Sequence, residues 1–369
     1  MKILLVRLRL IGDVVFTTPL IRALRRHHPT ARLTYVVEPG SAAVVRGNPH
    51  LDEVIVLPKS RGWARLRDDL AAARDLRARR FDVVIDLHGG PRSAWLTWAT
   101  GARRRIGYAM AGRSWMYTDS VVRAPDLTPR HSVRNQWDLL GPLGIADPDP
   151  GTDPVEMTED PAAAGRVEAW LQEAGITAAN PLVVVHVSAG NPFRRWPAES
   201  FVGLVTALAS AGPERRILLT SGPSELAAAA AIASEAGRRL GRELPVVHSV
   251  DFDMLELRSL IARAAVYIGG DSGPAHVAAT TGTPIVQILG PTLPERSRPW
   301  RDARWFSETI DAGTLPCRPC HQRHCVPGDF RCLTTIGADR VAAAAERALK
   351  EVGADFSPGT SREKSAPTS

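Results

Sequence analysis

The feature of this sequence that most constrains its fold is an alternation of short apolar runs with helical segments. In the first third of the chain the apolar runs occupy 2–7, 33–37, 53–57 and 81–87. The segment 14–27, between the first two runs, has the apolar spacing of a helix. Short apolar runs that alternate with helices are typical of βαβ units, whose strands form a parallel sheet with right-handed crossovers.

The same pattern starts again after the segment 142–161, which is rich in Pro, Gly and Asp and predicts a linker. The later apolar runs occupy 182–187, 216–220, 246–247, 266–269 and 284–289. A chain of 369 residues is also too long for one core of ordinary size. The sequence therefore predicts an α/β protein with two Rossmann-like, doubly wound parallel-sheet domains over 1–150 and 162–346. The tail 356–369 lacks apolar anchors and is expected to be disordered.

Composition excludes several classes of protein. Hydrophobic residues make up 44% and charged residues 23% of the chain, as in soluble globular proteins. No apolar run approaches the roughly 18 residues that a membrane span requires. Arg7 interrupts the first apolar run too early for a signal peptide. The expected location is the cytoplasm, where the four cysteines would stay reduced.

The basic residues are concentrated early in the chain. Residues 1–134 contain 24 Lys and Arg against 11 Asp and Glu, a net charge of +13, whereas the whole chain carries +7. This uneven distribution of charge suits a phosphorylated acceptor, an anionic membrane face or nucleic acid as a partner. The arginines within 65–80 could equally form a solvated helix surface. Nucleic acid is the weakest of these alternatives, because this half has no basic-aromatic stacking motif and no zinc-finger spacing.

The first candidate site is the loop after the first strand. Gly12 allows close approach of a ligand to the backbone, and Asp13 is expected at the N-cap of the following helix. In open α/β sheets, ligands bind at the carboxyl ends of the strands, where this loop lies. Asp13 could also serve only as a cap, so the loop alone does not establish a function. The absence of a G-x-G-x-x-G pattern from this loop disfavours a simple NAD dehydrogenase.

Two further candidate loops lie in the second domain. Ser188, Arg194 and Arg195 stand between a strand and a helix that is expected to begin near Pro197. Guanidinium groups at a strand end suit bidentate contact with phosphate, the alternative being two solvated arginines beside a core tryptophan. Glu225 follows the next strand in a glycine-containing turn and could accept hydrogen bonds from a ribose, although this signal is weak by itself.

The strongest candidate is the loop 269–284. A strand ends there in two glycines, and a short helix is expected to begin at Ser272 and Gly273. The free N–H groups and the positive dipole end of such a helix suit a pyrophosphate. Asp271 could accept hydrogen bonds from sugar hydroxyls, and His276 lies one turn into the helix. A lone histidine is more often a satisfied core residue, but its position beside this loop favours a role in the site.

Taken together, these motifs resemble glycosyltransferase family 9, the ADP-heptose:lipopolysaccharide heptosyltransferases. The ordered set comprises the opening Lys-Ile-Leu-Leu-Val-Arg, Ile-Gly-Asp at 11–13, Thr-Thr-Pro at 17–19, Arg-Arg-Trp-Pro at 194–197 and Gly-Asp-Ser-Gly-Pro-Ala-His at 270–276. The similarity covers roughly residues 1–346. The resemblance implies a GT-B fold, in which two Rossmann-like domains face each other across a central cleft. It also implies that the N-terminal domain binds the acceptor, that the C-terminal domain binds the nucleotide sugar, and that the transfer inverts the anomeric configuration without a metal.

The resemblance further assigns roles to residues of this chain. Asp13 is similar to the family's general base, which takes the proton of the acceptor hydroxyl during a single displacement. Arg194 stands where the family usually has a lysine that contacts the pyrophosphate, which leaves open whether Arg194 or Arg195 makes this contact. Glu225 resembles the ribose contact, and Asp271 resembles a residue that holds the sugar. The residues around the diphosphate would be Ser272, Gly273 and His276. The leaving-group charge would then be met by cations and a helix terminus rather than by Mg²⁺.

The four cysteines lie close together in the sequence, in the order Cys317-x2-Cys320-x4-Cys325-x6-Cys332. His321 and His324 stand between them, so the group could be a tetrahedral zinc set, but it lacks two matched Cys-x2-Cys knuckles. We favour reduced, partly buried thiols, and expect neither a metal nor another cofactor.

The sequence therefore predicts transfer of a heptose from ADP-heptose to a phosphorylated, lipid-linked inner-core lipopolysaccharide acceptor. The reaction would take place at the inner face of the cytoplasmic membrane, with peripheral association of the protein. Arg61, Arg92 and Arg104 are candidates for contacts with acceptor phosphates, because each flanks a strand end or a turn. Two alternatives stay open: a nucleotide-sugar 2-epimerase of the same fold, and a non-catalytic sugar-nucleotide-binding protein. The sequence determines neither the donor sugar nor the acceptor position.

Overall fold

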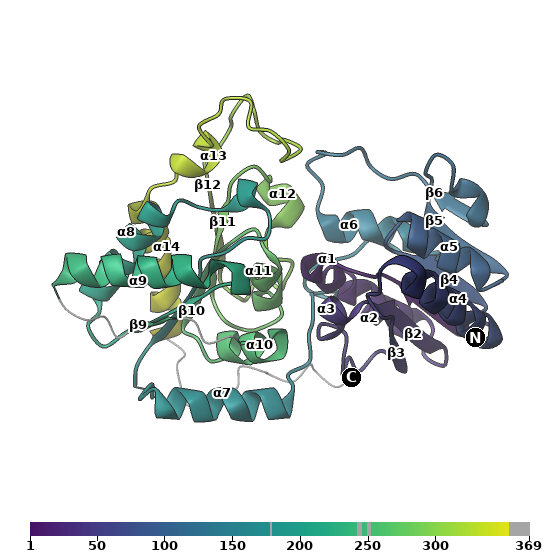
Figure 1. Cartoon of the computed structure of the whole chain (residues 1–369), viewed down its shortest axis with the longest axis horizontal. Coiled ribbons are helices and arrows are strands. Elements are labelled where there is room, and N and C mark those ends of the chain that lie inside the picture. The colour runs from purple at the N-terminus through teal and green to yellow at the C-terminus, as the bar shows by residue number, and fades with distance from the viewer. Residues whose placement is uncertain (178, 242–245, 249–251, 354–369) are drawn as a thin grey trace. The chain divides into compact units, whose positions relative to one another are not determined.

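The chain folds into two compact units, Met1–Thr158 and Glu159–Ser369, which we call unit 1 and unit 2 (Figure 1). The computed structural model describes residues 1–177, 179–241, 246–248 and 252–353. The units divide within the segment that the sequence predicted as a linker. The tail that was expected to be disordered lies outside the described residues.

Unit 1 is built on a parallel sheet of six described strands, in the order β3-β2-β1-β4-β5-β6. These strands are β1 (Lys2–Val6), β2 (Arg32–Val37), β3 (Glu53–Val56), β4 (Val83–Asp86), β5 (Arg104–Tyr108) and β6 (Asp119–Val121). The helices are α1 (Ile11–Val15), α2 (Thr18–His27), α3 (Pro39–Ala42), α4 (Gly62–Ala78), α5 (Pro91–Ala99), η1 (Ser114–Met116), α6 (Ser132–Trp137) and η2 (Asp138–Leu143). β1 lies between β2 and β4 and is apolar and completely buried over residues 3–6, because helices cover both faces of a parallel sheet.

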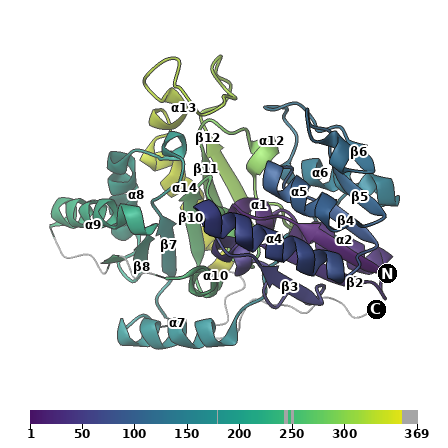
Figure 2. The same ribbon diagram turned by 45° about the vertical axis from the view of Figure 1, so that its right-hand side comes forward.

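Unit 2 has a second parallel sheet of six described strands, in the order β12-β11-β10-β7-β8-β9. These strands are β7 (Leu182–His186), β8 (Arg216–Thr220), β9 (Val246–His248), β10 (Val266–Gly270), β11 (Ile285–Leu289) and β12 (Ser307–Asp311). The helices are α7 (Pro161–Glu173), η3 (Pro192–Arg194), α8 (Ala198–Ala211), η4 (Pro223–Glu225), α9 (Leu226–Leu240), α10 (Met254–Ala262), α11 (Gly273–Ala278), α12 (Pro294–Ser297), α13 (Arg331–Thr334) and α14 (Ala338–Gly353). Figure 2 shows β11, β10, β7 and β8 side by side.

The two sheets share one topology. When the strands of each unit are numbered from its own first strand, both orders read 3-2-1-4-5-6, which is the Rossmann order. The prediction of two doubly wound α/β domains is therefore confirmed. The strand order reverses between β1 and β4 in unit 1 and between β7 and β10 in unit 2. Ligands of such sheets bind at these switch points, beyond the carboxyl ends of the strands.

The helix expected over 14–27 is in fact divided into α1 and α2, with the break at Thr17. The hydroxyl group of Thr17 donates to the backbone oxygen of Val14 at 2.7 Å, which competes with continuation of the helix. Pro19 then stands in the first turn of α2, where its missing N–H is not needed. None of the described helices is long and apolar enough to cross a membrane.

Candidate active site

The switch point of unit 1 places Asp13 in the segment after β1 and His88 in the segment after β4. The N-cap residue of α1 is Leu10, which has a φ of 71°, so the expectation that Asp13 caps this helix was wrong. Asp13 is the third residue of α1. Its carboxylate is therefore available for contacts other than capping.

The carboxylate of Asp13 forms an ion pair with Arg7, which follows β1. The guanidinium group of Arg7 also donates to the backbone oxygen of Leu87 at 2.6 Å, and 11% of its side chain is exposed. By contrast, 32% of the Asp13 side chain is exposed. A carboxylate that is fixed on one side by a cation and open on the other can accept a proton from a bound hydroxyl group.

The loop after β4 is organised by the buried carboxyl group of Asp86. This group accepts hydrogen bonds from the backbone N–H groups of His88 and Gly89 at 3.0 and 2.9 Å. It also accepts from the hydroxyl groups of Ser93 and Tyr117 at 3.0 and 2.7 Å. Burial raises the pKa of Asp86, although these hydrogen bonds act in the opposite direction. The position of His88 is thus fixed through its own backbone.

His88 is a candidate site residue that the sequence analysis missed. Burial and the positive charges of Arg7 and Arg9 lower the pKa of His88 to about 4, although Asp13 acts to raise it. The imidazole is therefore neutral near pH 7 and lies within electrostatic reach of Asp13. Its Nδ1 has no hydrogen-bond partner within the described part of the chain. A His-Gly-Gly triplet directly after a predicted strand was the signal that could have identified it.

In unit 2, Ser188 connects the loops that follow β7 and β8. Its hydroxyl oxygen accepts from the backbone N–H of Gly222 at 2.9 Å and lies 3.1 Å from Nε2 of His186. His186 contacts the hydroxyl group of Thr220 at 3.0 Å, and burial lowers the pKa of His186 to about 4. Ser188 is itself buried, so its role in this structure is to hold two loops together. This geometry disfavours the expected contact of Ser188 with a substrate.

The adjacent arginines reach two different carboxylates. Arg195 pairs with Glu225 at 2.5 Å, and Arg194 pairs with Asp271 at 3.0 Å. Residues selected from three separate motifs therefore meet in two ion pairs beside the switch point. Arg194 and Arg195 keep 32% and 43% of their side chains exposed. Cations with accessible faces at strand ends can contact the phosphates of a nucleotide.

The Asp271 carboxylate is almost completely buried and has several partners besides Arg194. The hydroxyl group of Ser297 donates to its Oδ1 at 2.6 Å, and Nε2 of His276 lies 3.5 Å from the same oxygen. Burial alone would raise the pKa of Asp271, but His276, the charge of Arg194 and the Ser297 hydroxyl hold it well below its usual range. Asp271 therefore stays ionised and anchors the surrounding side chains.

The short helix α11 begins where the sequence predicted. Ser272 is its N-cap residue and Gly273 its first residue, and the hydroxyl group of Ser272 makes no capping hydrogen bond. That hydroxyl group instead donates to the backbone oxygen of Gly270 at 3.4 Å. A Cβ atom on Gly270 would lie 3.4 Å from the backbone oxygen of Arg194, so glycine permits the two loops to approach closely. Contact of this helix end with a diphosphate stays a prediction.

Gln322 is a second residue that the sequence analysis missed. Its Oε1 accepts from Nε of Arg194 at 2.6 Å and from Nδ2 of Asn191 at 3.0 Å, while its Nε2 donates to the hydroxyl oxygen of Thr292 at 3.1 Å. Gln322 lies in the cysteine-rich segment, 128 residues from Arg194 in the chain. No sequence pattern connects the two, because the contact depends on how a loop without regular structure folds back.

Two of the three arginines expected to contact acceptor phosphates are already paired within unit 1. Arg92 pairs with two carboxylates, each at 2.6 Å, and 10% of its side chain is exposed. Arg104 pairs with Asp119 at 3.1 Å and donates to the backbone oxygen of Pro142 at 2.5 Å. Arg61 is exposed just before α4. The geometry therefore disfavours Arg92 as a phosphate ligand, whereas Arg61 and the partly exposed Arg104 stay candidates.

The four cysteines line one pocket of about 380 Å³ in unit 2, together with His324. All four are free thiols of intermediate exposure. Burial and the three neighbouring cysteines raise the pKa of Cys332 to about 11. Within the described part of the chain, no three His, Cys, Asp or Glu side chains are grouped so that they could hold a metal ion. The fold thus gathers the thiols without arranging them as a ligand set.

Two parallel sheets of Rossmann order, with charged side chains at both switch points, fit the architecture expected of a GT-B glycosyltransferase. The family of the protein follows from the sequence: the model of glycosyltransferase family 9 (heptosyltransferase) matches residues 70–329. The chain therefore belongs to this family and is a glycosyltransferase.

Individual relatives agree with this assignment. Lipopolysaccharide heptosyltransferase 3 of Escherichia coli strain K12 is 28% identical over 92% of this chain and 96% of its own length. A solved structure of a glycosyl transferase family 9 protein from Veillonella parvula has a TM-score of 0.81 and 24% identity, covering 95% of this chain and 97% of that one. The ADP-heptose lps heptosyltransferase II of E. coli has a TM-score of 0.75 and 19% identity, covering 96% of this chain and all of the other. These two likenesses support the fold.

Proposed function

We propose that this enzyme transfers a heptose from ADP-heptose to a phosphorylated, lipid-linked inner-core lipopolysaccharide acceptor. The transfer inverts the anomeric configuration and needs no metal ion. Family membership and the names of the relatives support the class of donor and acceptor. The observation that carries the chemistry is the partly exposed Asp13 carboxylate, held by Arg7 at the switch point of unit 1.

Asp13 acts as the general base in this proposal. Inversion in a single displacement requires one group to remove the proton of the acceptor hydroxyl as that oxygen attacks the anomeric carbon. Arg7 orients the carboxylate and leaves its other side open. The neutral His88 can exchange hydrogen bonds with substrate hydroxyl groups near Asp13 without adding charge.

Unit 2 binds the nucleotide sugar. Arg194 and Arg195 contact the diphosphate, together with Ser272, Gly273 and His276 at the start of α11. Glu225 accepts from the ribose hydroxyl groups and Asp271 orients the sugar. The two ion pairs support these roles, because they hold both arginines in place while leaving part of each exposed. Preorganised cations of this kind stabilise the charge that develops on the leaving diphosphate.

Unit 1 binds the acceptor at the inner face of the cytoplasmic membrane. Its excess of arginine favours a phosphorylated acceptor and an anionic surface. Removing the acceptor phosphates should raise KM for the acceptor and leave the affinity for the donor unchanged. An acceptor that reacts equally well after dephosphorylation would contradict this part of the proposal.

The experiment that tests the proposal compares a panel of nucleotide sugars by calorimetry and by turnover. ADP-heptose should bind tighter than UDP- or GDP-linked sugars, and turnover should require the acceptor and persist in EDTA. Activity that is lost in EDTA and restored by Mg²⁺ would contradict metal independence. A product formed from the donor alone would indicate an epimerase, and binding without turnover would indicate a non-catalytic protein.

A further inference from the structure

Unit 1 exposes an unusual number of large apolar side chains over α4, α5 and η1. On α4, Trp63 is 86% exposed, and Leu66 and Leu70 are also exposed. On α5 and η1, Trp98 and Trp115 are exposed and stack edge to face, with ring centroids 5.8 Å apart. We call these five residues the α4–α5 face. A cluster of exposed aromatic and aliphatic residues marks an interaction site more often than isolated apolar residues do.

The apolar residues of α4 are exposed because of how this helix packs. Of its 17 residues, Ala73 and Leu76 are the buried ones. Trp63, Leu66 and Leu70 are spaced by three and four residues, so they share one side of the helix. That side faces away from the sheet, since all three residues are exposed. The helix therefore presents an apolar stripe to the surroundings that packing of unit 1 does not explain.

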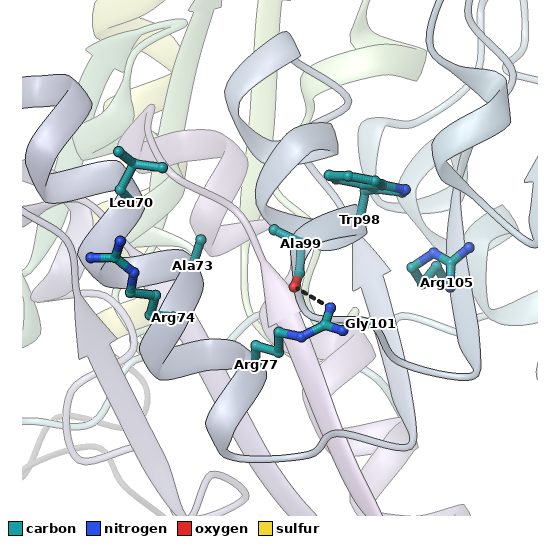
Figure 3. Close-up of a pocket in the computed structure, with 8 residues that line it drawn as sticks. All are labelled: Leu70, Ala73, Arg74, Arg77, Trp98, Ala99, Gly101 and Arg105. Carbon is teal, nitrogen blue, oxygen red and sulfur yellow. Dashed lines mark hydrogen bonds between the residues drawn. The ribbon is translucent and has the colours of Figure 1, made fainter.

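A pocket of about 350 Å³ lies between α4, α5 and the start of β5 (Figure 3). Leu70, Ala73, Trp98 and Ala99 form much of its wall. The polar part of its lining consists of three arginines. These are Arg74, Arg77 and Arg105. The pocket therefore combines an apolar wall with positive charge.

No carboxylate in the described part of the chain pairs with these three arginines. Arg77 donates to the backbone oxygen of Ala99 at 3.4 Å, as Figure 3 shows, and Arg105 donates to two backbone oxygens. Other arginines of this helix do find partners: Arg65 and Arg67 lie 3.7 and 3.2 Å from aspartates. The segment 61–80 holds seven arginines against three aspartates. Like charges that are gathered around one pocket repel each other unless an anion joins them.

We propose that the α4–α5 face and its pocket bind the anionic surface of a lipid bilayer. Trp98 and Trp115 lie at the level of the headgroups, where amphipathic rings are favoured. Arg74, Arg77 and Arg105 contact headgroup phosphates, and Trp63, Leu66 and Leu70 enter the boundary of the acyl chains. Basic residues beside exposed apolar residues are attracted to an anionic leaflet. This proposal adds a binding surface to the proposed location at the membrane face. It is argued from the exposed residues of unit 1 and does not depend on which sugar the enzyme transfers.

The test is cosedimentation of the full chain with vesicles, without any nucleotide sugar. Wild type should pellet with vesicles of phosphatidylglycerol mixed with phosphatidylcholine, and much less with phosphatidylcholine alone. Arg74→Gln with Arg77→Gln should weaken binding by roughly fivefold for each arginine. Trp63→Ser with Leu66→Ser should weaken it to a similar or greater extent, and added salt should weaken the wild type.

Matched controls lie on unit 2. Val326→Ser replaces an equally exposed apolar residue, and Arg340→Gln replaces an exposed arginine of α14, so neither should change vesicle binding. Circular dichroism and turnover with a delipidated acceptor should be unchanged in all variants, which separates this proposal from the proposed reaction. Wild type that pellets equally with both vesicle types, or variants that pellet as wild type does, would overturn it. A change of oligomeric state in Trp63→Ser with Leu66→Ser, with vesicle binding intact, would instead make this face a contact between copies and would also overturn it.

Discussion

The two units share a topology but use their switch points differently. Each places an arginine–aspartate pair there: Arg7 with Asp13 in unit 1, and Arg194 with Asp271 in unit 2. The Asp13 side chain is 32% exposed and has one charged partner, whereas Asp271 is 2% exposed and lies against Ser297 and His276 as well. An accessible carboxylate can exchange a proton with a substrate, and a buried, ion-paired one can position other groups. The same fold thus holds one accessible aspartate, which we propose as the general base, and one buried aspartate that anchors its neighbours.

The surfaces of the two units differ in a related way. Unit 1 contains 24 basic against 16 acidic side chains, and unit 2 contains 22 against 23. Of the eleven large apolar side chains found exposed among the described residues, nine belong to unit 1. Unit 1 is thereby suited to an anionic, amphipathic partner, and unit 2 is close to neutral.

The largest effect is expected for Asp13→Asn. The variant removes the proton acceptor but keeps an oxygen that can accept from Arg7, so kcat should fall by about 10²–10⁴-fold, or ~3–5 kcal/mol on the barrier. Because Asp13 is not the helix cap, the free energy of unfolding should change little. Steady-state kinetics and urea denaturation check both expectations.

Asp75→Asn on the exposed surface of α4 is the control for Asp13→Asn and should leave kcat unchanged. If Asp13→Asn retained kcat within about threefold of wild type, under ~1 kcal/mol, then Asp13 would be a structural residue. The contrast between the two aspartates would then disappear.

Asp271→Asn should differ from Asp13→Asn in stability, with a loss of about 3 kcal/mol in urea denaturation. Removing one partner of a buried ion pair costs roughly 3–5 kcal/mol, and partial hydration of Arg194 favours the lower end of this range. The surface variant Asp302→Asn is the control and should lose much less. A loss below about 1 kcal/mol for Asp271→Asn would mean that Asp271 does not anchor this region.

The same residue gives a prediction for pH. The folded protein lowers the pKa of Asp271 below its unfolded value, so the stabilisation is fully present above that unfolded value of about 3.9. It is lost as the pH falls through the lower pKa of the folded state. The difference in the free energy of unfolding between wild type and Asp271→Asn should therefore be constant from pH 5 to 7. It should shrink below about pH 4. A difference that grew on acidification would contradict the pKa direction.

Within unit 2, the roles of Arg194 and Arg195 can be distinguished by how much substitution of each one weakens the binding of ADP. Arg194 is held by Asp271 and Gln322, so Arg194→Gln should raise the Kd for ADP by about tenfold or more, as expected for loss of a charge-assisted hydrogen bond. Arg195 is more exposed, and Arg195→Gln should have a smaller effect. Arg194→Lys keeps the charge and should lie between wild type and Arg194→Gln. Calorimetry that ranks Arg195→Gln as the more damaging change would assign the diphosphate contact to Arg195.

The smallest effect is expected for Ser188→Ala. The change leaves the partly buried backbone N–H of Gly222 without its acceptor and should cost roughly 1 kcal/mol of stability. Because this hydroxyl group is occupied within unit 2, the Kd for ADP should change by less than about threefold. Thermal denaturation and calorimetry measure the two quantities. Loss of ADP affinity without loss of stability would show that Ser188 contacts the nucleotide directly.

Sequence patterns identified the strands that are buried on both faces but missed strands of other character. β5 begins with two arginines, and β6 and β12 lie at the edges of their sheets with largely polar residues. A strand of this kind has no apolar run, because its place depends on backbone pairing with a neighbour. The expected N-cap role of Asp13 was wrong because α1 begins earlier than the apolar pattern indicates, with Leu10 as its N-cap residue.

What the sequence by itself determined is the two-domain α/β fold and the family, and it also indicated the loops that we propose as the site. Burial of apolar strands between helices leaves a periodic pattern, and glycines, arginines and acids at strand ends leave local motifs, so both can be found without coordinates. Tertiary structure alone decided the partners: Arg7 for Asp13, Gln322 for Arg194, and an open side for Trp63 and Leu66. Gln322 and Arg194 lie far apart in the chain, the pairing of Arg7 with Asp13 depends on the path of the chain between β1 and α1, and exposure depends on what covers a helix. None of these leaves a pattern in sequence.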